Sequence, residues 1–292
     1  MTAELVGVQT PAPPAPSLLE KAARVLAAFE GPEPRLSLTE VIRRSGIPRS
    51  SAHRILDQLV QLRWLDREGR DYRMGMRMLE LGALAAHHNR LRRAALPRLH
   101  ALHESTGHLV HLYVLDGTEV VCLERIGGSE DSTVPSRTGG RMPAHSTAAG
   151  KALLAFGDPA ALTALLAHRL RPLTPRTLVN PVALRSELAA TRDRGVAFDR
   201  EETYRGVSCV AAPLRGAGRA IAAVSVSGHG IHRDLDRLAP SVRACTRGVW
   251  GDLFGPGRAA AAPQAAPPAP RTRVSEGEMD AMMGWLRFSE WM

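Results

Sequence analysis

Apolar residues recur at three- and four-residue intervals over two short stretches between residues 37 and 62, and a break separates the two stretches. Ser37 and Glu40 fit a capping box, which predicts a first helix over Leu38–Ser45. Gly46 can take the left-handed conformation that ends this helix, and Pro48 suits the first turn of another. The second helix is predicted from apolar positions that share one face: Ala52, Ile55, Leu56, Leu59 and Leu62.

The opposite face of the second helix is polar, and it is basic at its N-terminal end, where a recognition helix meets base edges. Leu65-Asp66 and Tyr72-Arg73 flank a turn with arginines, which predicts a two-stranded wing. A solvated helix surface has the same polar pattern. We predict a winged helix-turn-helix that binds double-stranded DNA through Arg43, Arg44, Arg49, Ser50, Ser51, His53, Arg54, Arg70 and Arg73.

Helical periodicity continues beyond the wing, with apolar residues from Met78 to Leu102. The pattern predicts a long linker helix that is broken or restarted between Asn89 and Pro97. Its apolar residues either offer a dimer surface or pack on their own domain.

The pattern changes to strands beyond Gly107, where two apolar segments flank Asp116-Gly117 and predict a hairpin. A further strand is expected over 134–142, followed by a helix capped by Ser146. A second hairpin is expected around 215–218, with helices over 158–167, 182–194 and 235–254. Antiparallel strands mixed with helices predict an α+β sensor-like domain.

The composition shifts along the chain predict six segments. Proline, alanine and other small residues bury little apolar surface, so they predict disorder near both ends. The segments are 1–16, a disordered leader; 17–75, the winged domain; 76–92, the linker helix; 93–254, the sensor-like domain; 255–274, a Pro/Ala linker; and 275–292, a short amphipathic helix. This last helix either docks on a groove of the same dimer or on a partner, or it is an extension without such a role.

Charge and cysteine usage support this assignment only in part. The net charge of +9 suits a polyanionic partner, but Lys21 and Lys151 are the only lysines, and a GC-rich genome explains the arginine bias equally well. The three scattered cysteines fit a reducing cytoplasm. No apolar run reaches membrane-spanning length, so we expect a cytoplasmic protein.

Motifs in three regions resemble those of a known family, and the likeness covers about residues 17–254. IPRSSAHRILDQLVQLRWL followed by YRMGMRMLELG resembles the recognition helix, wing and linker entry of the IclR family of bacterial transcriptional regulators. RMPAHSTAAGKALLAF is similar to the central signature of that family, and RGVAFDREETYRGVSCVAAPL with AIAAVSVSG is similar to its C-terminal signature. Several motifs in the same order make this resemblance specific, whereas a lone helix-turn-helix would be weak support.

The resemblance implies an α+β fold in which a winged helix-turn-helix of three helices and a β wing is joined by a linker helix to an effector-binding domain with a GAF/profilin-like antiparallel sheet. It implies a ligand-responsive, sequence-specific regulator, a repressor rather than an activator. Such a protein binds a palindromic operator as a homodimer or as a homotetramer, a dimer of dimers. Its other partner would be a small-molecule effector, a carboxylate or an aromatic compound, and no membrane or cofactor is expected.

An effector pocket follows from motif position in this resemblance. Backbone amides of residues 148–150 at a helix start suit a carboxylate, and Ser225 and Ser227 share one strand face. Asp199 disfavours a free carboxylate unless it is protonated or accepts a ligand hydroxyl. The implied pocket consists of Val134, Met142, Ala148, Ala149, Asp199, Val207, Cys209, Ser225 and Ser227.

Two other readings of the second domain stay open from the residues: a small-molecule-processing enzyme and a metal sensor. Gly150-Lys151 does not complete a P-loop, but His145 with Ser146, or Asp199 with Cys209, are possible base and nucleophile pairs. A metal sensor would use His100, His103, His108 and His111, which lack a cysteine or acidic residue at an obvious zinc-ligand spacing. We therefore expect no enzyme activity, no catalytic residues and no metal site.

Overall fold

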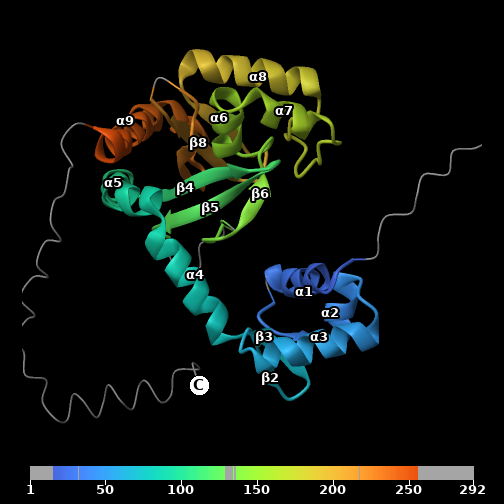
Figure 1. Cartoon of the computed structure of the whole chain (residues 1–292). Helices are drawn as coiled ribbons and strands as arrows, with labels where there is room; N and C mark the ends of the chain where they lie inside the picture. The colour runs from blue at the N-terminus through green and yellow to red at the C-terminus, as the bar shows by residue number, and fades with distance from the viewer. Residues whose placement is uncertain (1–15, 32, 129–133, 135, 217, 256–292) are drawn as a thin grey trace, which may run out of the picture. The chain divides into compact units, whose positions relative to one another are not determined.

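The first elements of the chain build a small helical domain with a β wing (Figure 1). The computed structural model describes residues 16–31, 33–128, 134, 136–216 and 218–255. The elements are α1 (Leu18–Ala27), a 3₁₀ turn η1 (Ala28–Glu30), β1 (Leu36–Ser37), α2 (Leu38–Ser45), α3 (Arg49–Gln61), β2 (Leu65–Glu68) and β3 (Asp71–Met74). The three strands form one antiparallel sheet in the order β1-β3-β2.

The capping box that opens α2 is confirmed. The amide of Glu40 donates to Ser37 Oγ over 3.3 Å, and the amide of Ser37 donates to Glu40 Oε2 over 2.9 Å. Gly46 ends the helix with a φ of 65°, in the left-handed region that glycine tolerates. Ile47 is buried between α2 and α3 in the domain core. The local signals for the helix-turn-helix therefore agree with the packing of its core.

The predicted apolar face of α3 is buried at four of its five positions. Leu62 is the exception, because α3 ends at Gln61 and the side chain of Leu62 at the C-cap is 60% exposed. In the wing, Glu68 pairs with Asp71 across a turn in which Gly69 has a φ of 62°. The strands of the wing are thus longer than the two dipeptides that predicted them.

The predicted linker consists of two helices, α4 (Met76–His88) and α5 (Arg90–Thr106). The break is at Asn89, whose Oδ1 accepts the amide of Arg92 and caps α5, while Pro97 lies inside α5 without ending it. No side chain of α4 is buried, and its large apolar side chains include Leu79, which is 57% exposed. The dimer surface remains a prediction for this helix.

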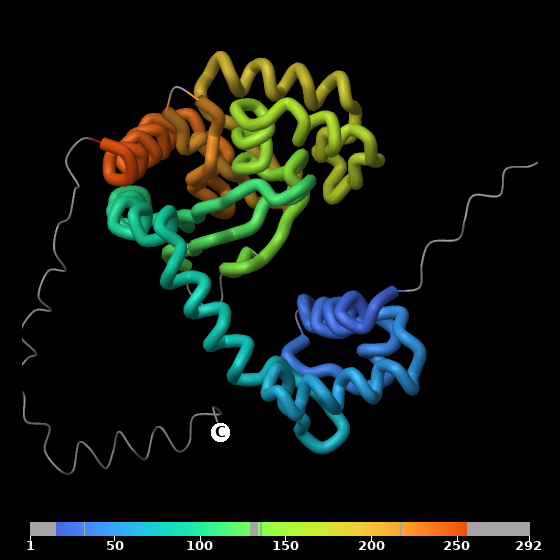
Figure 2. The backbone as a smooth tube through the Cα atoms, in the orientation of Figure 1, coloured from blue at the N-terminus to red at the C-terminus, as the bar shows by residue number. Residues whose placement is uncertain are grey.

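The second domain is built on a six-stranded sheet in the order β6-β5-β4-β9-β8-β7, with every neighbouring pair antiparallel. Its elements after α5 are β4 (Leu109–Asp116), β5 (Glu119–Ile126), β6 (Arg141–Pro143), α6 (Ala148–Phe156), α7 (Pro159–Leu166), α8 (Pro181–Arg194), β7 (Ala197–Arg200), β8 (Val207–Leu214), β9 (Ala222–His229), η2 (Ile231–Arg233) and α9 (Leu235–Phe254). Helices α5 and α9 cover one face, and α6, α7 and α8 cover the other (Figure 2).

Strand alternation separates the two faces of this sheet chemically. Val224 and Val226 of β9 belong to the core formed with α5 and α9. Ser225 lies between these two valines and Ser227 follows Val226, and both serines are buried on the opposite face of the sheet, which α6 covers. A polar surface is therefore enclosed between the sheet and α6.

Two local predictions in the second domain are wrong. The strand expected over 134–142 is reduced to β6, because a turn at Gly139 with a φ of 77° separates Arg141 from the residues before it. The cap of α6 is Thr147 instead of Ser146, whose hydroxyl donates to the carbonyl of Pro143.

The proposed leader over 1–16 and the segments proposed for 255–274 and 275–292 lie outside the described residues, apart from residues 16 and 255. Within the described part, no helix has both the length and the apolar character needed to cross a membrane.

Candidate functional site

A narrow cavity with a volume of about 30 Å³ lies between the second-domain sheet and the start of α6. The structure brings together around it all the residues that the family resemblance assigned to a pocket. They are Val134, Met142, Ala148, Ala149, Asp199, Val207, Cys209, Ser225 and Ser227. Ligand binding by these residues is not tested by their position and remains a prediction.

The sheet register explains why residues distant in sequence meet at this cavity. Asp199 on β7 pairs with Cys209 on β8, and Cys209 pairs with Ser227 on β9. Two residues before Ser227 on β9, Ser225 pairs with His111 on β4. Cross-strand partners point to the same face of a sheet, so this register places a polar row along the cavity floor.

The N-terminus of α6 forms another wall. Thr147 Oγ1 accepts the amide of Gly150 over 3.0 Å, which leaves Ala148 and Ala149 at the start of the helix facing the cavity. A Cβ at residue 150 would collide with the backbone of Ala144, so glycine allows this close approach. The amides at a helix N-terminus favour a negatively charged or electron-rich group.

Asp199 is the acidic group of the cavity and is 1% exposed. Its Oδ1 accepts the amides of Glu202 over 2.7 Å and of Thr203 over 3.4 Å. Burial, followed by the nearby carboxylate of Glu202, raises the pKa of Asp199 to about 6. The side chain is therefore poised to change its protonation state at mildly acidic pH.

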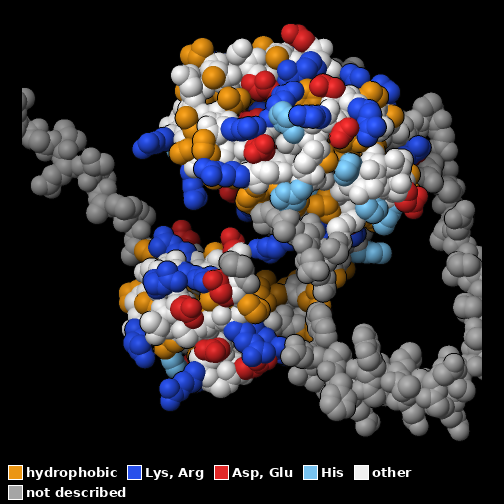
Figure 3. Space-filling model, turned by 180° about the vertical axis from the view of Figure 1, so that it is seen from behind, with side chains coloured by type: hydrophobic (Ala, Val, Ile, Leu, Met, Phe, Trp, Pro, Cys, Tyr) orange, Lys and Arg blue, Asp and Glu red, His pale blue; other side chains and the backbone are white. Residues whose placement is uncertain are grey.

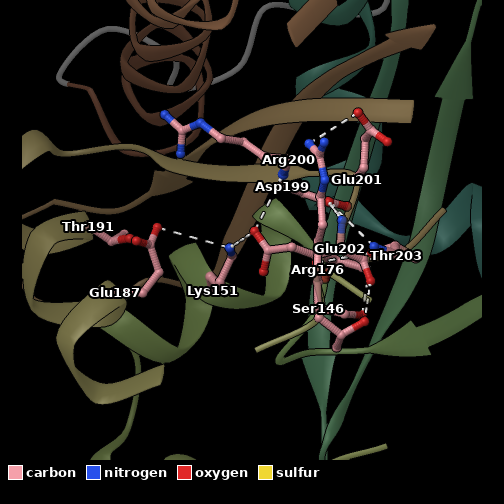
Figure 4. Close-up of polar contacts among 12 residues, drawn as sticks. Ser146, Lys151, Arg176, Glu187, Thr191, Asp199, Arg200, Glu201, Glu202 and Thr203 are labelled. Carbon is pink, nitrogen blue, oxygen red and sulfur yellow. Dashed lines mark hydrogen bonds and ion pairs between the residues drawn. The ribbon is translucent and has the colours of Figure 1, made fainter. Parts of the chain in front are cut away.

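A buried ion pair includes Glu202, whose amide donates to Asp199 (Figure 4). Lys151 of α6 is 1% exposed, and its Nζ lies 2.5 Å from Glu202 Oε1 and 4.0 Å from Glu187 Oε1. Glu187 also pairs with Arg194 over 2.8 Å. The sequence showed Lys151 as one of two lysines and as part of an incomplete P-loop, and it carried no local signal of this ion pair.

Several polar cavity residues were missing from the predicted pocket: His111, Tyr113, Ser136, Thr147, Thr203 and Tyr204. The alternation of side chains along β4 was a sequence signal for His111 and Tyr113. The ring of His111 stacks on Tyr113 with a centroid distance of 5.5 Å. Its Nε2 lies 2.8 Å from Ser136 Oγ. Burial, with a further contribution from Arg125, lowers the pKa of His111 to about 3, so the imidazole is neutral.

The residues predicted to contact DNA divide into an exposed group and a group engaged within the winged domain. Arg43, Arg49, Ser50, His53, Arg54 and Arg70 are exposed, Ser51 is half-buried, and His53 Nδ1 also lies 2.9 Å from Asp57 Oδ2 within α3. On the face shown in Figure 3, basic side chains of the winged domain stand among acidic ones. At the start of α3 the exposed side chains are therefore available to a polyanion.

Arg44 and Arg73 are engaged with residues of neighbouring elements. Arg44 donates to the carbonyl of Ala28 over 3.2 Å and pairs with Glu33 over 2.7 Å. Arg73 lies 3.0 Å from Glu68 and 3.5 Å from Asp66 on the neighbouring strand of the wing. Both side chains are paired within the winged domain, and a DNA contact would have to compete with these pairs.

The geometry weighs against the nucleophile pairs considered from the sequence. His145 contacts the carbonyl of Arg171, whereas Ser146 donates to Pro143, so each is engaged away from the other. Burial, and secondarily Asp199, raises the pKa of the Cys209 thiol far above its usual value, which disfavours a thiolate. Among the described residues, no group of three or more His, Cys, Asp or Glu side chains is arranged to hold a metal.

Comparisons with known proteins agree with the two-part architecture. Residues 18–69 match the family model described as IclR helix-turn-helix domain, and residues 83–249 match the one described as Bacterial transcriptional regulator IclR C-terminal. The HTH-type transcriptional regulator XynR of Escherichia coli is 38% identical over 213 residues, which cover 72% of this chain and 84% of that protein. The Glycerol operon regulatory protein of Streptomyces coelicolor is 35% identical over 249 residues, 82% of this chain and 97% of the relative.

A solved structure is also similar. It is an IclR homolog from Microbacterium hydrocarbonoxydans in complex with 4-hydroxybenzoate, with a TM-score of 0.73 and 30% sequence identity, and the match covers 81% of this chain and 99% of that one.

Proposed function

Because the chain belongs to the IclR family of bacterial transcriptional regulators, we propose that it represses transcription by binding a palindromic operator and that a small molecule in the second-domain cavity controls this binding. The observation that carries the proposal is the pairing, in one chain, of an exposed basic N-terminal end of α3 with a cavity lined by both polar and apolar side chains. A recognition helix uses such an end to read base edges.

The effector is a small carboxylate or an aromatic compound, and a carboxylate binds here only if Asp199 is protonated or accepts a hydroxyl of the ligand. The start of α6 offers amides to a negative group at Ala148 and Ala149, while Val134, Met142 and Val207 supply apolar surface. The related structure holds 4-hydroxybenzoate, a molecule that combines both features. A ligand can shift DNA binding only through different affinities for two arrangements of the protein.

A palindromic operator requires two recognition helices, so the active species is a dimer or a dimer of dimers. The exposed apolar side chains of α4 are our candidate for the contact between copies: Met76, Leu79, Leu81 and Leu84. Repression is favoured because relatives include the Transcriptional repressor IclR of Escherichia coli and the Acetate operon repressor of Salmonella typhimurium. Since the target is DNA, the site of action is the cytoplasm.

The direct test is to select genomic fragments with the purified full-length chain and then to screen small carboxylates for release of the best-bound fragment. We expect a fragment with an inverted repeat, bound more tightly than random duplex, and at least one carboxylate that changes its affinity. Binding that does not depend on sequence, or a bound fragment that no carboxylate affects, would contradict the proposal.

A further inference from the structure

His111 and Ser136 both line the cavity and form a hydrogen-bonded pair. His111 is 1% exposed, and its Nε2 is hydrogen-bonded to Ser136 Oγ over 2.8 Å. Its other ring nitrogen, Nδ1, is buried and has no hydrogen-bond partner within the described part of the chain. A buried polar atom without a partner is costly, so this nitrogen is suited to a group that enters with a ligand.

His111 and Asp199 belong to different ends of the cavity. The register runs from Asp199 on β7 through β8 and β9 to β4, where His111 pairs with Ser225 of β9. Three inter-strand steps of roughly 4.8 Å separate β7 from β4 by about 14 Å at the level of the backbone. The cavity therefore offers polar groups at two ends, with Ser225 and Ser227 between them.

The end of the cavity that contains His111 suits an uncharged group. Burial, and secondarily Arg125, which pairs with His111 across β4 and β5, keeps the imidazole neutral. A neutral ring has one donor and one acceptor nitrogen, and Ser136 occupies Nε2. A hydroxyl satisfies the remaining nitrogen in either tautomer because it both donates and accepts, whereas a carboxylate only accepts.

The neutral ring and its unpaired nitrogen also argue against His111 and Ser136 as a general base and a nucleophile. The pKa of His111, about 3, makes the imidazole a poor base at neutral pH. The nitrogen that an orienting carboxylate would hold in a catalytic triad has no partner among the described residues. Recognition, without chemistry on the bound molecule, is the role that remains.

We propose that His111 and Ser136 determine which effector binds, by hydrogen bonding a hydroxyl group of a small hydroxycarboxylic acid whose carboxylate lies at the start of α6. The inference rests on the effector site of the proposed function and adds the chemical class of the ligand. Acids that lack the hydroxyl leave Nδ1 unpaired and bind more weakly.

Isothermal titration of the full-length chain with two matched pairs of acids tests the proposal: 4-hydroxybenzoate against benzoate, and lactate against propionate. We expect the hydroxylated member of at least one pair to bind about tenfold more tightly, the size of one hydrogen bond to a buried group. His111→Phe, which keeps an aromatic ring against Tyr113, should reduce this preference to about threefold or less. His111→Asn keeps a neutral donor and acceptor and should retain more of the preference than His111→Phe.

Ser136→Ala should reduce the preference in the same direction as His111→Phe, because it frees Nε2 and disturbs the ring orientation. His100→Phe is the matched control, since His100 is exposed in the same domain, and it should leave the preference unchanged. Thermal unfolding of each ligand-free variant identifies any that fails to fold, and the more conservative His111→Asn then provides the comparison.

The proposal is overturned if the folded His111 variants keep the wild-type preference, or if no hydroxylated member of either pair binds more tightly than its partner. These outcomes are separate from a failure of the proposed function. An acid that binds with a His111-dependent preference but does not change DNA affinity contradicts the proposed function alone. An acid that releases DNA without any dependence on His111 contradicts this inference alone.

Discussion

The two functional regions carry their charged side chains in opposite ways. At the start of α3, Arg49 and Arg54 are exposed. In the second domain, Lys151 and Asp199 are each 1% exposed and are held by other groups of the protein. An exposed cation stays hydrated and available to a polyanion, whereas a buried charge needs a partner before the domain can fold. Substitutions in the first region should therefore change binding, and substitutions in the second should first change stability.

Among the substitutions that test this difference between the two regions, Lys151→Met should have the largest effect on the free energy of unfolding. The substitution leaves Glu202 buried without its partner at 2.5 Å and removes a cation from Glu187. Breaking a buried pair in this way costs about 3–5 kcal/mol, which chemical denaturation of the second domain would measure. The control is Lys21→Met, which replaces the only other lysine, in α1, and should change the free energy of unfolding by about 0.5 kcal/mol or less. If Lys151→Met lowers the free energy of unfolding by less than about 1 kcal/mol, the expected difference between the two regions is wrong.

Asp199→Asn should change how stability depends on pH. The pKa of Asp199 is about 6 in the folded protein against an ordinary value of 3.8, so the folded state binds the proton more tightly than the unfolded state. Stability from this group is present below about pH 4 and is lost as the pH rises to about 6, by up to about 3 kcal/mol. The variant should lack this loss.

Unfolding midpoints of the wild type and the Asp199→Asn variant, measured at pH 4, 5, 6 and 7, test this prediction. As the pH falls toward 4, the unfolding midpoint of the wild type should approach that of the variant. As the pH rises toward 7, the two midpoints should separate. Asp193→Asn, at an exposed position of α8, should follow the wild type. Parallel curves for Asp199→Asn and the wild type would show that Asp199 does not titrate in this range.

The helix-turn-helix could be predicted in detail because its signals are local. Ser37, Glu40 and Gly46 act within one helix, and the structure confirms the capping box and the bounds of α2. Leu62 was assigned to the core because periodicity does not say where a helix ends. The contacts of Arg44 with Ala28 and Glu33 join segments distant in sequence, so they could not be predicted locally, and its DNA contact stays a prediction.

The cavity was less accessible to sequence reasoning. Its residues could be assigned by resemblance, and alternation correctly placed Ser225 and Ser227 on one face. The neighbours of these serines depend on strand order, and the residues of β4 and β9 do not by themselves predict that these two strands are adjacent. His111 was therefore considered only as a metal ligand, and the partner of Lys151 was not identified.

Arg54→Ala addresses the exposed region. A base-contacting arginine contributes about 1–3 kcal/mol, so the variant should bind its selected operator more weakly and distinguish it less well from random duplex. Its thermal stability should stay unchanged, because Arg54 is exposed on α3. Arg44→Ala is the informative comparison, since it removes the contacts to Ala28 and Glu33 and should lower stability. Equal loss on operator and random DNA for Arg54→Ala would rule out its base contact.

The smallest effect is expected from Arg70→Ala at the turn of the wing, where the side chain is exposed. A phosphate contact carries no sequence information, so affinity should fall evenly for operator and random duplex, by about 1 kcal/mol or less. The slope of the logarithm of affinity against the logarithm of salt concentration should flatten by about one. Arg73→Ala is the matched variant, because Arg73 is already paired with Glu68 and Asp66, and it should flatten the slope less. An unchanged slope for Arg70→Ala, or a larger change for Arg73→Ala, would mean that pairing within the wing does not decide which arginines reach the DNA.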